Sequence, residues 1–243
     1  PSADPAASGS PAAEDTGDGE TLGYIGISMP TQSLERWNRD GAFLRDQFEA
    51  SGYQAELLYA NNEVDQQVSD IQNLIADGVD LLVISAIDGE SLNTVVDEAA
   101  ENGIPVIAYD RLIMNDNVQY YVSFDNFSVG VLQGQFLEEQ LGLADRTADD
   151  PAYIEFTAGD PADNNAPFFY NGAMSILQPY LDSGVLVCLS GQTDFDVVAT
   201  EQWNTDTALD RAQTILASYY SGGEHLDAWL CSNDSTALGV TQA

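Results

Sequence analysis

Polar and aromatic side chains follow the predicted strands of this chain at regular intervals. The segments concerned are M-P-T-Q-S-L-E-R-W (29–37), A-I-D-G (86–89), Y-D-R (109–111), A-G-D-P-A-D-N-N-A-P-F-F-Y (158–170), S-G-Q (190–192), Q-W-N (202–204) and S-N-D (232–234). In open α/β sheets, ligands bind beyond the carboxyl ends of the strands. The side chains in these segments are therefore candidates for ligand binding rather than for the core.

The residue types in these segments suit an uncharged, polyhydroxylated ligand. Amides, carboxylates and guanidiniums offer paired donors or acceptors to neighbouring hydroxyl groups, and an aromatic ring can cover the C–H face of a sugar. Each buried hydroxyl without a partner costs on the order of 1–3 kcal/mol, so many such groups must converge. The candidates at the strand ends are Arg36, Trp37, Asp88, Asp110, Arg111, Asn164, Asn165 and Trp203.

Simpler structural interpretations exist for most of these candidates. Arg36 and Arg111 are two of only six basic residues and could be surface arginines that balance excess acid, but their place in strand-end loops favours binding. Trp37 could instead be a core residue on a helix face. Asp88 and the pair 164–165 could be helix N-caps, a role compatible with ligand contact where a helix start faces a cleft.

The elements that must position these side chains alternate between strand and helix. Continuous apolar runs at 81–84 and 104–108 are typical of strands covered on both faces. Between them, apolar residues recur at helical spacing, at Leu92, Val95, Val96 and Ala99. The expected strands are 22–28, 54–59, 80–85, 104–108, 119–123, 152–157, 185–190 and 226–231. The expected helices are 34–51, 64–77, 90–102, 127–141, 166–181, 205–221 and one from 235 onward.

This alternation predicts an α/β fold of two doubly wound parallel-sheet domains with right-handed crossovers. The passage V-S-F-D-N-F-S-V-G (122–130) is interpreted as the crossing, which gives a first domain at 22–124 and a second at 125–243. Residues 1–21 are acidic, rich in Pro, Ala, Ser and Gly, and without a bulky apolar residue, so they are predicted to be a disordered linker. Such a tether suits an exported protein, including one held at the cell surface by a lipid anchor.

The charge of the chain argues against several classes of function. It carries 40 acidic residues, six arginines and no lysine, for a net charge of −34. We expect no binding to nucleic acid or to an anionic membrane surface, because no basic surface can replace the counterions. The absence of lysine excludes a P-loop and a Schiff-base site. The acidic excess is interpreted as a solvated surface, with life at high salt as the alternative.

Signatures of catalysis or of a metal centre are lacking. The sequence has no G-x-S-x-G, no G-x-G-x-x-G and no C-x-x-C, and its single histidine, His225, is expected on the surface. We predict no catalytic residue, no metal and no cofactor. Cys188 and Cys231 could pair in an exported protein, but free, buried thiols are preferred, because an intervening strand would separate them by roughly 10 Å.

Several segments of the chain, taken together, match a known family pattern. They are I-G-I-S-M-P-T, S-A-I-D-G, I-P-V-I-A-Y-D-R-L-I, F-D-N-F-S-V-G, G-D-P-A-D-N-N-A-P-F-F-Y-N-G-A-M, Q-W-N and S-N-D-S-T-A-L-G, in that order. They resemble the periplasmic or surface-tethered monosaccharide-binding proteins of ABC importers, in the multiple-sugar-binding group related to galactose/glucose- and ribose-binding proteins. The resemblance covers the chain from Leu22 to its end.

The resemblance implies a type I periplasmic-binding-protein fold, with two similar α/β domains joined by a hinge and an aldose held in the cleft. Trp37 and Trp203 would sandwich the pyranose ring, and the remaining site residues would hydrogen-bond its hydroxyls. The family pattern continues beyond S-N-D and returns to the first domain, so the resemblance also implies that a C-terminal part is missing. The implied ligand-binding residues are Arg36, Trp37, Asp88, Asp110, Arg111, Asn126, Asn164, Asn165, Trp203 and Asn233.

The predicted function is that of an extracytoplasmic solute-binding protein, in the periplasm or at the cell surface. It would capture an aldose such as galactose, glucose, arabinose or xylose by hinge closure, and deliver it to the membrane permease of an ABC importer. We expect a monomer without a membrane span. The alternatives are a sensor that presents bound sugar to a receptor or kinase, a sugar-processing hydrolase, and a repressor effector domain, which would need a helix-turn-helix that residues 1–21 cannot form.

Overall fold

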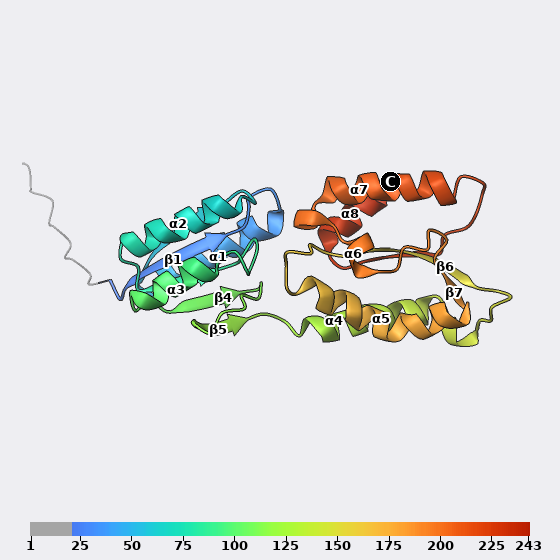
Figure 1. The fold of residues 1–243 in the computed structure, drawn as a ribbon, viewed down its shortest axis with the longest axis horizontal. Coiled ribbons are helices and arrows are strands. Elements are labelled where there is room, and N and C mark those ends of the chain that lie inside the picture. Colours follow the sequence, from blue (N-terminus) through green and yellow to red (C-terminus); the bar gives the residue numbers. More distant parts are fainter. Residues whose placement is uncertain (1–20) are drawn as a thin grey trace, which may run out of the picture.

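The computed structural model of the chain describes residues 21–243, and these residues fold into two lobes arranged along the long axis of the molecule (Figure 1). The first lobe contains β1 to β5 and α1 to α3, and the second contains α4 to α8 and β6 to β8. The chain passes from the first lobe to the second between β5 and α4, where the predicted boundary at 124/125 falls. The linker predicted at 1–21 lies, except for its last residue, outside the described residues.

The first lobe is built on a five-stranded parallel sheet of order β2-β1-β3-β4-β5. Its core lies on both faces, with α1 packed on one and α2 and α3 on the other, which is the doubly wound arrangement. The four apolar residues predicted at helical spacing, Leu92, Val95, Val96 and Ala99, are all buried. The elements of this lobe are β1 (Tyr24–Met29), α1 (Glu35–Ala50), β2 (Gln54–Tyr59), α2 (Val64–Ala76), β3 (Leu81–Ile84), α3 (Asn93–Glu101), β4 (Val106–Tyr109) and β5 (Val118–Val122).

The second lobe has a three-stranded parallel sheet of order β7-β6-β8. Helices α4 and α5 lie on one side of it, and α7 and α8 lie on the other (Figure 1). Its elements are α4 (Asn126–Gln140), η1 (Leu143–Asp145), β6 (Ala152–Thr157), α5 (Ala166–Ser183), β7 (Leu186–Val187), α6 (Phe195–Val198), η2 (Glu201–Trp203), α7 (Thr205–Tyr219), β8 (Ala228–Cys231) and α8 (Asp234–Gln242).

All eight predicted strands and all seven predicted helices are present, but the strand expected at 185–190 is much shorter. Strand β7 ends at Val187 because the chain then turns, with the Gly191 amide donating to the Cys188 carbonyl at 3.0 Å. The Ser190 amide donates to the carboxylate of Glu155 at 3.0 Å instead of joining a ladder. The short elements η1, α6 and η2 were not predicted, since three or four residues are too few to display a period.

Two glycines bring α4 and α5 into backbone contact. A Cβ atom on Gly130 would lie 2.0 Å from the carbonyl oxygen of Phe169, and one on Gly172 would lie 2.2 Å from that of Phe127. This close approach fixes the start of α4, directly after the crossing between lobes, against the first turn of α5. Both helix starts face the first lobe.

A buried glutamine fixes the strand ends of the first lobe in the same way. The side-chain amide of Gln67, on α2, donates to the Ser85 carbonyl at 2.9 Å and to the Ser28 hydroxyl at 3.2 Å, and it accepts from the Ile87 amide at 2.8 Å. All three partners lie at or just beyond the carboxyl ends of β1 and β3. The loops that leave these ends are therefore held in a defined position.

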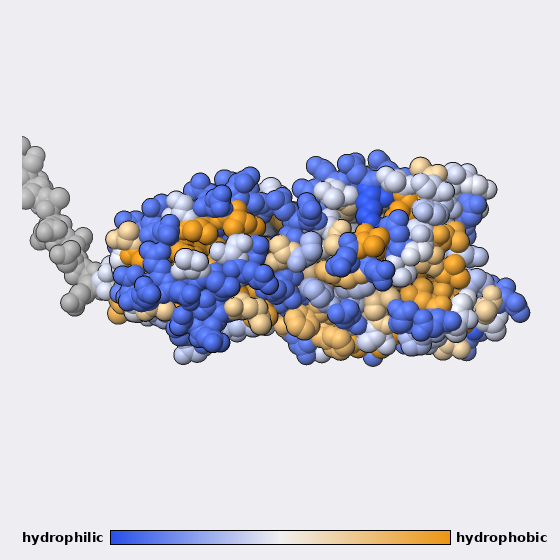
Figure 2. Space-filling model, viewed as in Figure 1, coloured by the Kyte–Doolittle hydropathy of each residue, from blue (hydrophilic) through white to orange (hydrophobic). Residues whose placement is uncertain are grey.

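The surface is mostly hydrophilic, but β5 and α4 present apolar side chains to solvent. Figure 2 shows hydrophilic residues over most of the visible face. The exposed apolar residues of this region include Tyr120, Val122, Phe124, Leu132 and Phe136. These side chains are exposed in the part of the chain that the structure describes.

The cysteines lie on either side of β6, as predicted, and both are free thiols. They are half-buried rather than fully buried, which corrects the expectation. Burial raises the pKa of Cys231 to about 12.

His225 is on the surface, as predicted, with Nε2 3.1 Å from a carboxylate oxygen of Asp227. Within residues 21–243, no helix has the length and apolar character needed to span a membrane.

Candidate ligand-binding site

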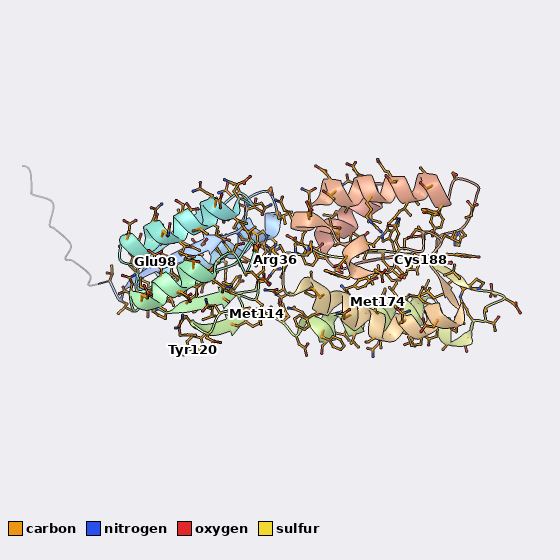
Figure 3. The ribbon with its side chains drawn as sticks, viewed as in Figure 1. Arg36, Glu98, Met114, Tyr120, Met174 and Cys188 are labelled. Atoms are coloured by element: carbon orange, nitrogen blue, oxygen red, sulfur yellow. The ribbon has the colours of Figure 1, made fainter. Side chains whose placement is uncertain are left out.

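A cavity lies between the lobes, at the carboxyl ends of strands from both sheets. Its volume is about 100 Å³. A single water needs about 10–15 Å³ on such a measure, so the cavity has room for a ligand several times larger than a water molecule. Figure 3 labels Arg36, one of the lining residues, at the junction of the lobes. The lining residues are Leu34, Arg36, Trp37, Asp110, Arg111, Phe124, Asn126, Asp163, Asn165, Phe169, Trp203, Asn233 and Ser235.

The structure brings eight of the ten sequence-predicted site residues together in this cavity. They come from strand ends or helix starts that lie far apart in the chain. They meet in space because parallel strands all end at the same edge of their sheet. The eight are Arg36, Trp37, Asp110, Arg111, Asn126, Asn165, Trp203 and Asn233. Asp88 and Asn164 do not line the cavity.

Arg111 is a buried cation that contacts both lobes. It follows β4, and its Nη1 donates to the Ala86 carbonyl at 2.9 Å. Its Nε lies 3.3 Å from Oδ2 of Asp163 in the second lobe, and both side chains are 5% exposed. Nε forms no hydrogen bond of good geometry with the described residues. Burial raises the pKa of Asp163, and the positive charge of Arg111 opposes that shift.

Asp110 connects three groups around the cavity from a strained backbone conformation. Its φ of +64° is in the left-handed region, which costs free energy for a residue other than glycine and which clusters at functional sites. Its carboxylate accepts a hydrogen bond from Arg36, and its carbonyl accepts from the side-chain amide of Asn165 at 2.7 Å. The same carbonyl accepts from the Tyr121 hydroxyl at 3.1 Å.

Arg36 lies at the start of α1 between two carboxylates. Its Nε is 3.2 Å from Oδ2 of Asp40, and its Nη2 pairs with Asp110. Burial by itself would lower the pKa of Arg36, but the charges of Asp110 and Asp40 outweigh it and raise that pKa. Both cavity arginines, Arg36 and Arg111, are thus paired with carboxylates, and the site offers a neutral ligand fixed hydrogen-bonding groups without a net positive charge.

Trp37 is both a core residue and a lining residue of the cavity, so its core role is compatible with a place in the candidate site, and its stacking on a ligand stays a prediction. It packs against β1 in the first lobe and is 3% exposed. The guanidinium carbon of Arg36 lies 4.7 Å from its ring centroid, and that of Arg111 lies 5.3 Å away. These distances are typical of cation–π contacts, which hold both arginines against the ring.

Trp203 is held in the opposite lobe by four contacts. Its indole Nε1 donates to Oδ2 of Asp163 at 3.2 Å, and its ring meets Phe169 edge-on at a centroid distance of 6.2 Å. A Cβ atom on Gly159 would lie only 2.0 Å from the ring, so only glycine leaves room for it. Its amide donates to the Thr200 carbonyl at 3.1 Å, and its φ is +54°.

The three lining asparagines have different local roles. The side chain of Asn165 does not cap α5; its Oδ1 accepts from the Tyr121 hydroxyl at 2.9 Å, so it links the lobes instead. Asn233 caps α8, with Oδ1 accepting from the Thr236 amide at 2.9 Å, and also lines the cavity. Asn126, next to the N-cap Asp125 of α4, is buried at 7% exposure.

The two remaining predicted residues are engaged elsewhere. The carboxylate of Asp88 accepts from the amides of Glu90 and Ser91 at 2.9 and 3.2 Å, in the turn that precedes α3. The N-cap interpretation of Asp88 is wrong, because α3 begins at Asn93 and its N-cap is Leu92. The side-chain amide of Asn164 donates to the Leu112 carbonyl at 3.1 Å, across the junction between lobes. Both side chains are therefore hydrogen-bonded to other parts of the protein and do not line the cavity.

Sequence reasoning missed five lining residues: Leu34, Phe124, Asp163, Phe169 and Ser235. Asp163 and Phe169 lie within the quoted segment 158–170, but only Asn164 and Asn165 were selected from it. The signal for Asp163 is the burial of Arg111, because a buried arginine requires a carboxylate partner, but that burial was not predicted. Phe124 and Leu34 carried no such signal.

Comparison with known proteins identifies the family. A family model described as periplasmic binding protein domain matches residues 25–243. The chain belongs to the periplasmic binding protein family. The predicted family and α/β fold class are thereby confirmed.

The names of several similar proteins describe them as sugar-binding. The chain is 46% identical over 230 residues to the multiple sugar-binding periplasmic protein SbpA of Azospirillum brasilense, covering 93% of this chain and 64% of that protein. It is 35% identical over 219 residues to the D-xylose-binding periplasmic protein of Escherichia coli, covering 90% of this chain and 61% of that protein. The chain thus spans less than two thirds of these relatives, in keeping with the expectation that part of the family pattern lies outside it.

Solved structures with bound sugar have the same fold. An ABC transporter solute-binding protein from Clostridium phytofermentans, with bound β-D-glucose, superposes with a TM-score of 0.87 at 54% identity, over 90% of this chain and 67% of that one. A carbohydrate transporter solute-binding protein from Chloroflexus aurantiacus, in complex with D-glucose, gives a TM-score of 0.77 at 30% identity, over 90% and 67%.

Proposed function

We propose that this chain is the sugar-capturing part of an extracytoplasmic solute-binding protein that binds a monosaccharide by lobe closure and delivers it to an ABC permease. One observation carries the proposal. Side chains from both lobes, on segments as distant as Arg36 and Asn233, line one cavity. Such a cavity is completed only when the lobes approach each other, so a ligand inside it favours the closed form.

The chemistry of the lining favours a neutral aldose. The two arginines are each paired with a carboxylate, at Asp110 and Asp163, so the lining has no uncompensated cation to attract a sugar acid or a phosphate. Amide groups from Asn126, Asn165 and Asn233 add neutral donors and acceptors. Trp37 and Trp203 are proposed to cover the two faces of the ring, as C–H groups favour an aromatic surface.

The ten predicted residues are proposed to have two different roles, direct contact with the sugar and positioning of the surrounding loops. Those that line the cavity are proposed to contact the sugar. Asp88 and Asn164 are proposed to act indirectly, by fixing the 88–91 turn and the junction at Leu112. Sugar names among the relatives, glucose and xylose included, support an aldose but do not select one for this chain.

Membership of the periplasmic binding protein family favours a transport role over a catalytic role. Relatives described as periplasmic support a site of action outside the cytoplasm. We propose that the protein acts there as a monomer, tethered through residues 1–21 and held at the membrane by a lipid anchor, with the permease as its partner. No covalent chemistry is proposed.

Isothermal titration of the chain with galactose, glucose, arabinose and xylose tests the proposal. We expect saturable heat at one site per chain for at least one of these sugars, together with an increase in the thermal midpoint. A sugar acid such as galacturonate should bind at least tenfold more weakly than its neutral parent, because the two arginines are already neutralised. No heat and no thermal shift with any aldose would contradict the proposal.

Sensing is a second candidate. One relative, 46% identical over 219 residues, is described as the multiple sugar-binding periplasmic receptor ChvE of Rhizobium radiobacter. Reconstitution separates the two roles. A sugar-loaded chain that stimulates the ATPase of its permease favours transport, whereas one that binds only a receptor or kinase favours sensing.

A further inference from the structure

Two strained backbone segments, one from each lobe, meet at the rim of the cleft. Among the described residues, five other than glycine have a positive φ, and four of these form two consecutive pairs. Asn61 and Asn62 have φ of 54° and 62°, and Gln202 and Trp203 have φ of 56° and 54°. The side-chain amide of Asn62 donates to Oε1 of Gln202 at 3.3 Å, although the two residues lie 140 positions apart.

The two pairs differ in how easily their residues adopt this conformation. Asparagine tolerates the left-handed region, because its short side chain can hydrogen-bond locally, whereas glutamine and tryptophan do not favour it. The conformation of Gln202 and Trp203 must therefore be held by surrounding contacts. Trp203 has such contacts within its own lobe, but the one side-chain hydrogen bond of Gln202 among the described residues goes to Asn62 in the other lobe.

The contact also joins the backbone segments from which the two cavity tryptophans come. The amide of Asn62 donates to the Pro30 carbonyl at 2.8 Å, at the start of the loop that leads to Trp37. Gln202 directly precedes Trp203 in the chain. Neither Asn62 nor Gln202 lines the cavity, so neither is in place to touch a ligand there.

We infer that Asn62 and Gln202 form a positioning contact that holds the Trp203 segment against the first lobe when the cleft is closed. The inference deepens the proposed function and rests on it. Because the contact lies outside the cavity and exists only when the lobes meet, breaking it should leave sugar entry unchanged and speed sugar release. The two side chains act on the dissociation rate rather than on which hydroxyls are recognised.

A double-mutant cycle on the 243-residue chain tests the inference. Asn62→Gly and Gln202→Gly remove the two side chains while glycine retains the positive φ without strain. The dissociation rate of the tightest-binding aldose is measured by stopped-flow tryptophan fluorescence. We expect each single variant to raise that rate about two- to tenfold, the range expected for one hydrogen bond, with the association rate changed less than twofold.

The double variant should release sugar no faster than the faster single variant, because both substitutions break the same contact. Gln72→Ala removes an exposed side-chain contact to Glu98, 3.1 Å long and within the first lobe, and should leave the rate unchanged. The order of preference among the four aldoses should be the same in all variants. A merely structural role would lower the thermal midpoint without this selective effect on release.

The outcomes separate this inference from the proposed function. If the unmodified chain binds aldose but the single variants release it at the native rate, or if their effects multiply in the double variant, the positioning contact is refuted and the proposed function stands. If the unmodified chain binds no aldose, the proposed function fails and the inference fails with it.

Discussion

The Nε of Arg111 lies 3.3 Å from Oδ2 of Asp163, and this buried ion pair joins the loop after β4 in the first lobe to the loop after β6 in the second. Each partner also holds an aromatic ring of the cavity. Arg111 lies over Trp37, and Asp163 accepts from the indole of Trp203. The pair therefore sets the relative position of the two tryptophans that are proposed to cover the sugar.

Replacing Asp163 by Asn removes the charge and retains an oxygen for Trp203. Loss of one partner from a buried pair typically costs about 3–5 kcal/mol, because the other charge stays desolvated. Burial, which raises the pKa of Asp163, offsets part of this cost at neutral pH, so we expect the free energy of unfolding in urea to fall by more than about 1 kcal/mol but less than about 3 kcal/mol. Asp46→Asn is the matched control, since it breaks the exposed ion pair with Arg45 and should cost less than about 1 kcal/mol. Equal, small losses in the two variants would show that the buried pair does not stabilise the fold.

The same substitution should change the pH dependence of stability in a defined direction. Burial raises the pKa of Asp163 above the ordinary value of 3.8, so the folded chain binds this proton more tightly than the unfolded chain. The stability that protonated Asp163 contributes is fully present below pH 3.8, and it is lost as the pH rises through the pKa of Asp163 in the folded chain. The free energy of unfolding of the native chain minus that of Asp163→Asn should therefore fall as the pH rises through this window. Urea titrations at a series of pH values measure it, and a difference that grows with pH would contradict the assignment.

A single methyl group at Gly159 should displace Trp203. The Cβ of alanine there would lie 2.0 Å from the indole ring, and such overpacking costs about 1–3 kcal/mol. We expect Gly159→Ala to weaken aldose binding by about that free energy, measured by titration calorimetry. At Gly222 the new methyl group would meet only the flexible, exposed carboxylate of Glu224, so Gly222→Ala should bind sugar normally. If Gly159→Ala binds aldose with the native affinity, Trp203 does not contact the sugar in the proposed site.

The net charge of −34 should make the fold sensitive to salt. Added salt shortens the Debye length from about 10 Å at 0.1 M to about 3 Å at 1 M, so repulsion between surface carboxylates weakens. We expect the thermal midpoint to rise across this range in both NaCl and KCl, by about 2–4 °C for each 1 kcal/mol gained. A midpoint that stays constant or falls would mean that repulsion among the acidic residues contributes little to stability.

The elements were predictable because their patterns are long and simple. The apolar runs of β3 and β4 and the helical stripe of α3 follow from burial on one or two faces, and all are found where expected. Strand β7 was overestimated because residues 188–190 have strand-like composition, yet the Glu155 carboxylate captures the Ser190 amide. A contact between distant residues thus overrode local propensity, which no local pattern can reveal.

The site was predictable in part, since strand ends can be read from a sequence but side-chain partners cannot. Arg111 and Trp203 were singled out from their place after strands, and they do line the cavity. Asp88 has the same kind of place, but its carboxylate is used by a local turn. Asp163 was overlooked because its role depends on Arg111, 52 positions away, and on the way the two lobes meet. Whether the lining residues contact a sugar stays a prediction.

A crystal structure of the chain with its tightest-binding aldose tests the central claim most directly. We predict one sugar ring in the cavity, between the rings of Trp37 and Trp203, with hydroxyl groups within hydrogen-bonding distance of Arg111 and Asn165. Sugar bound on another surface, or an empty cavity in crystals grown with saturating aldose, would contradict the account.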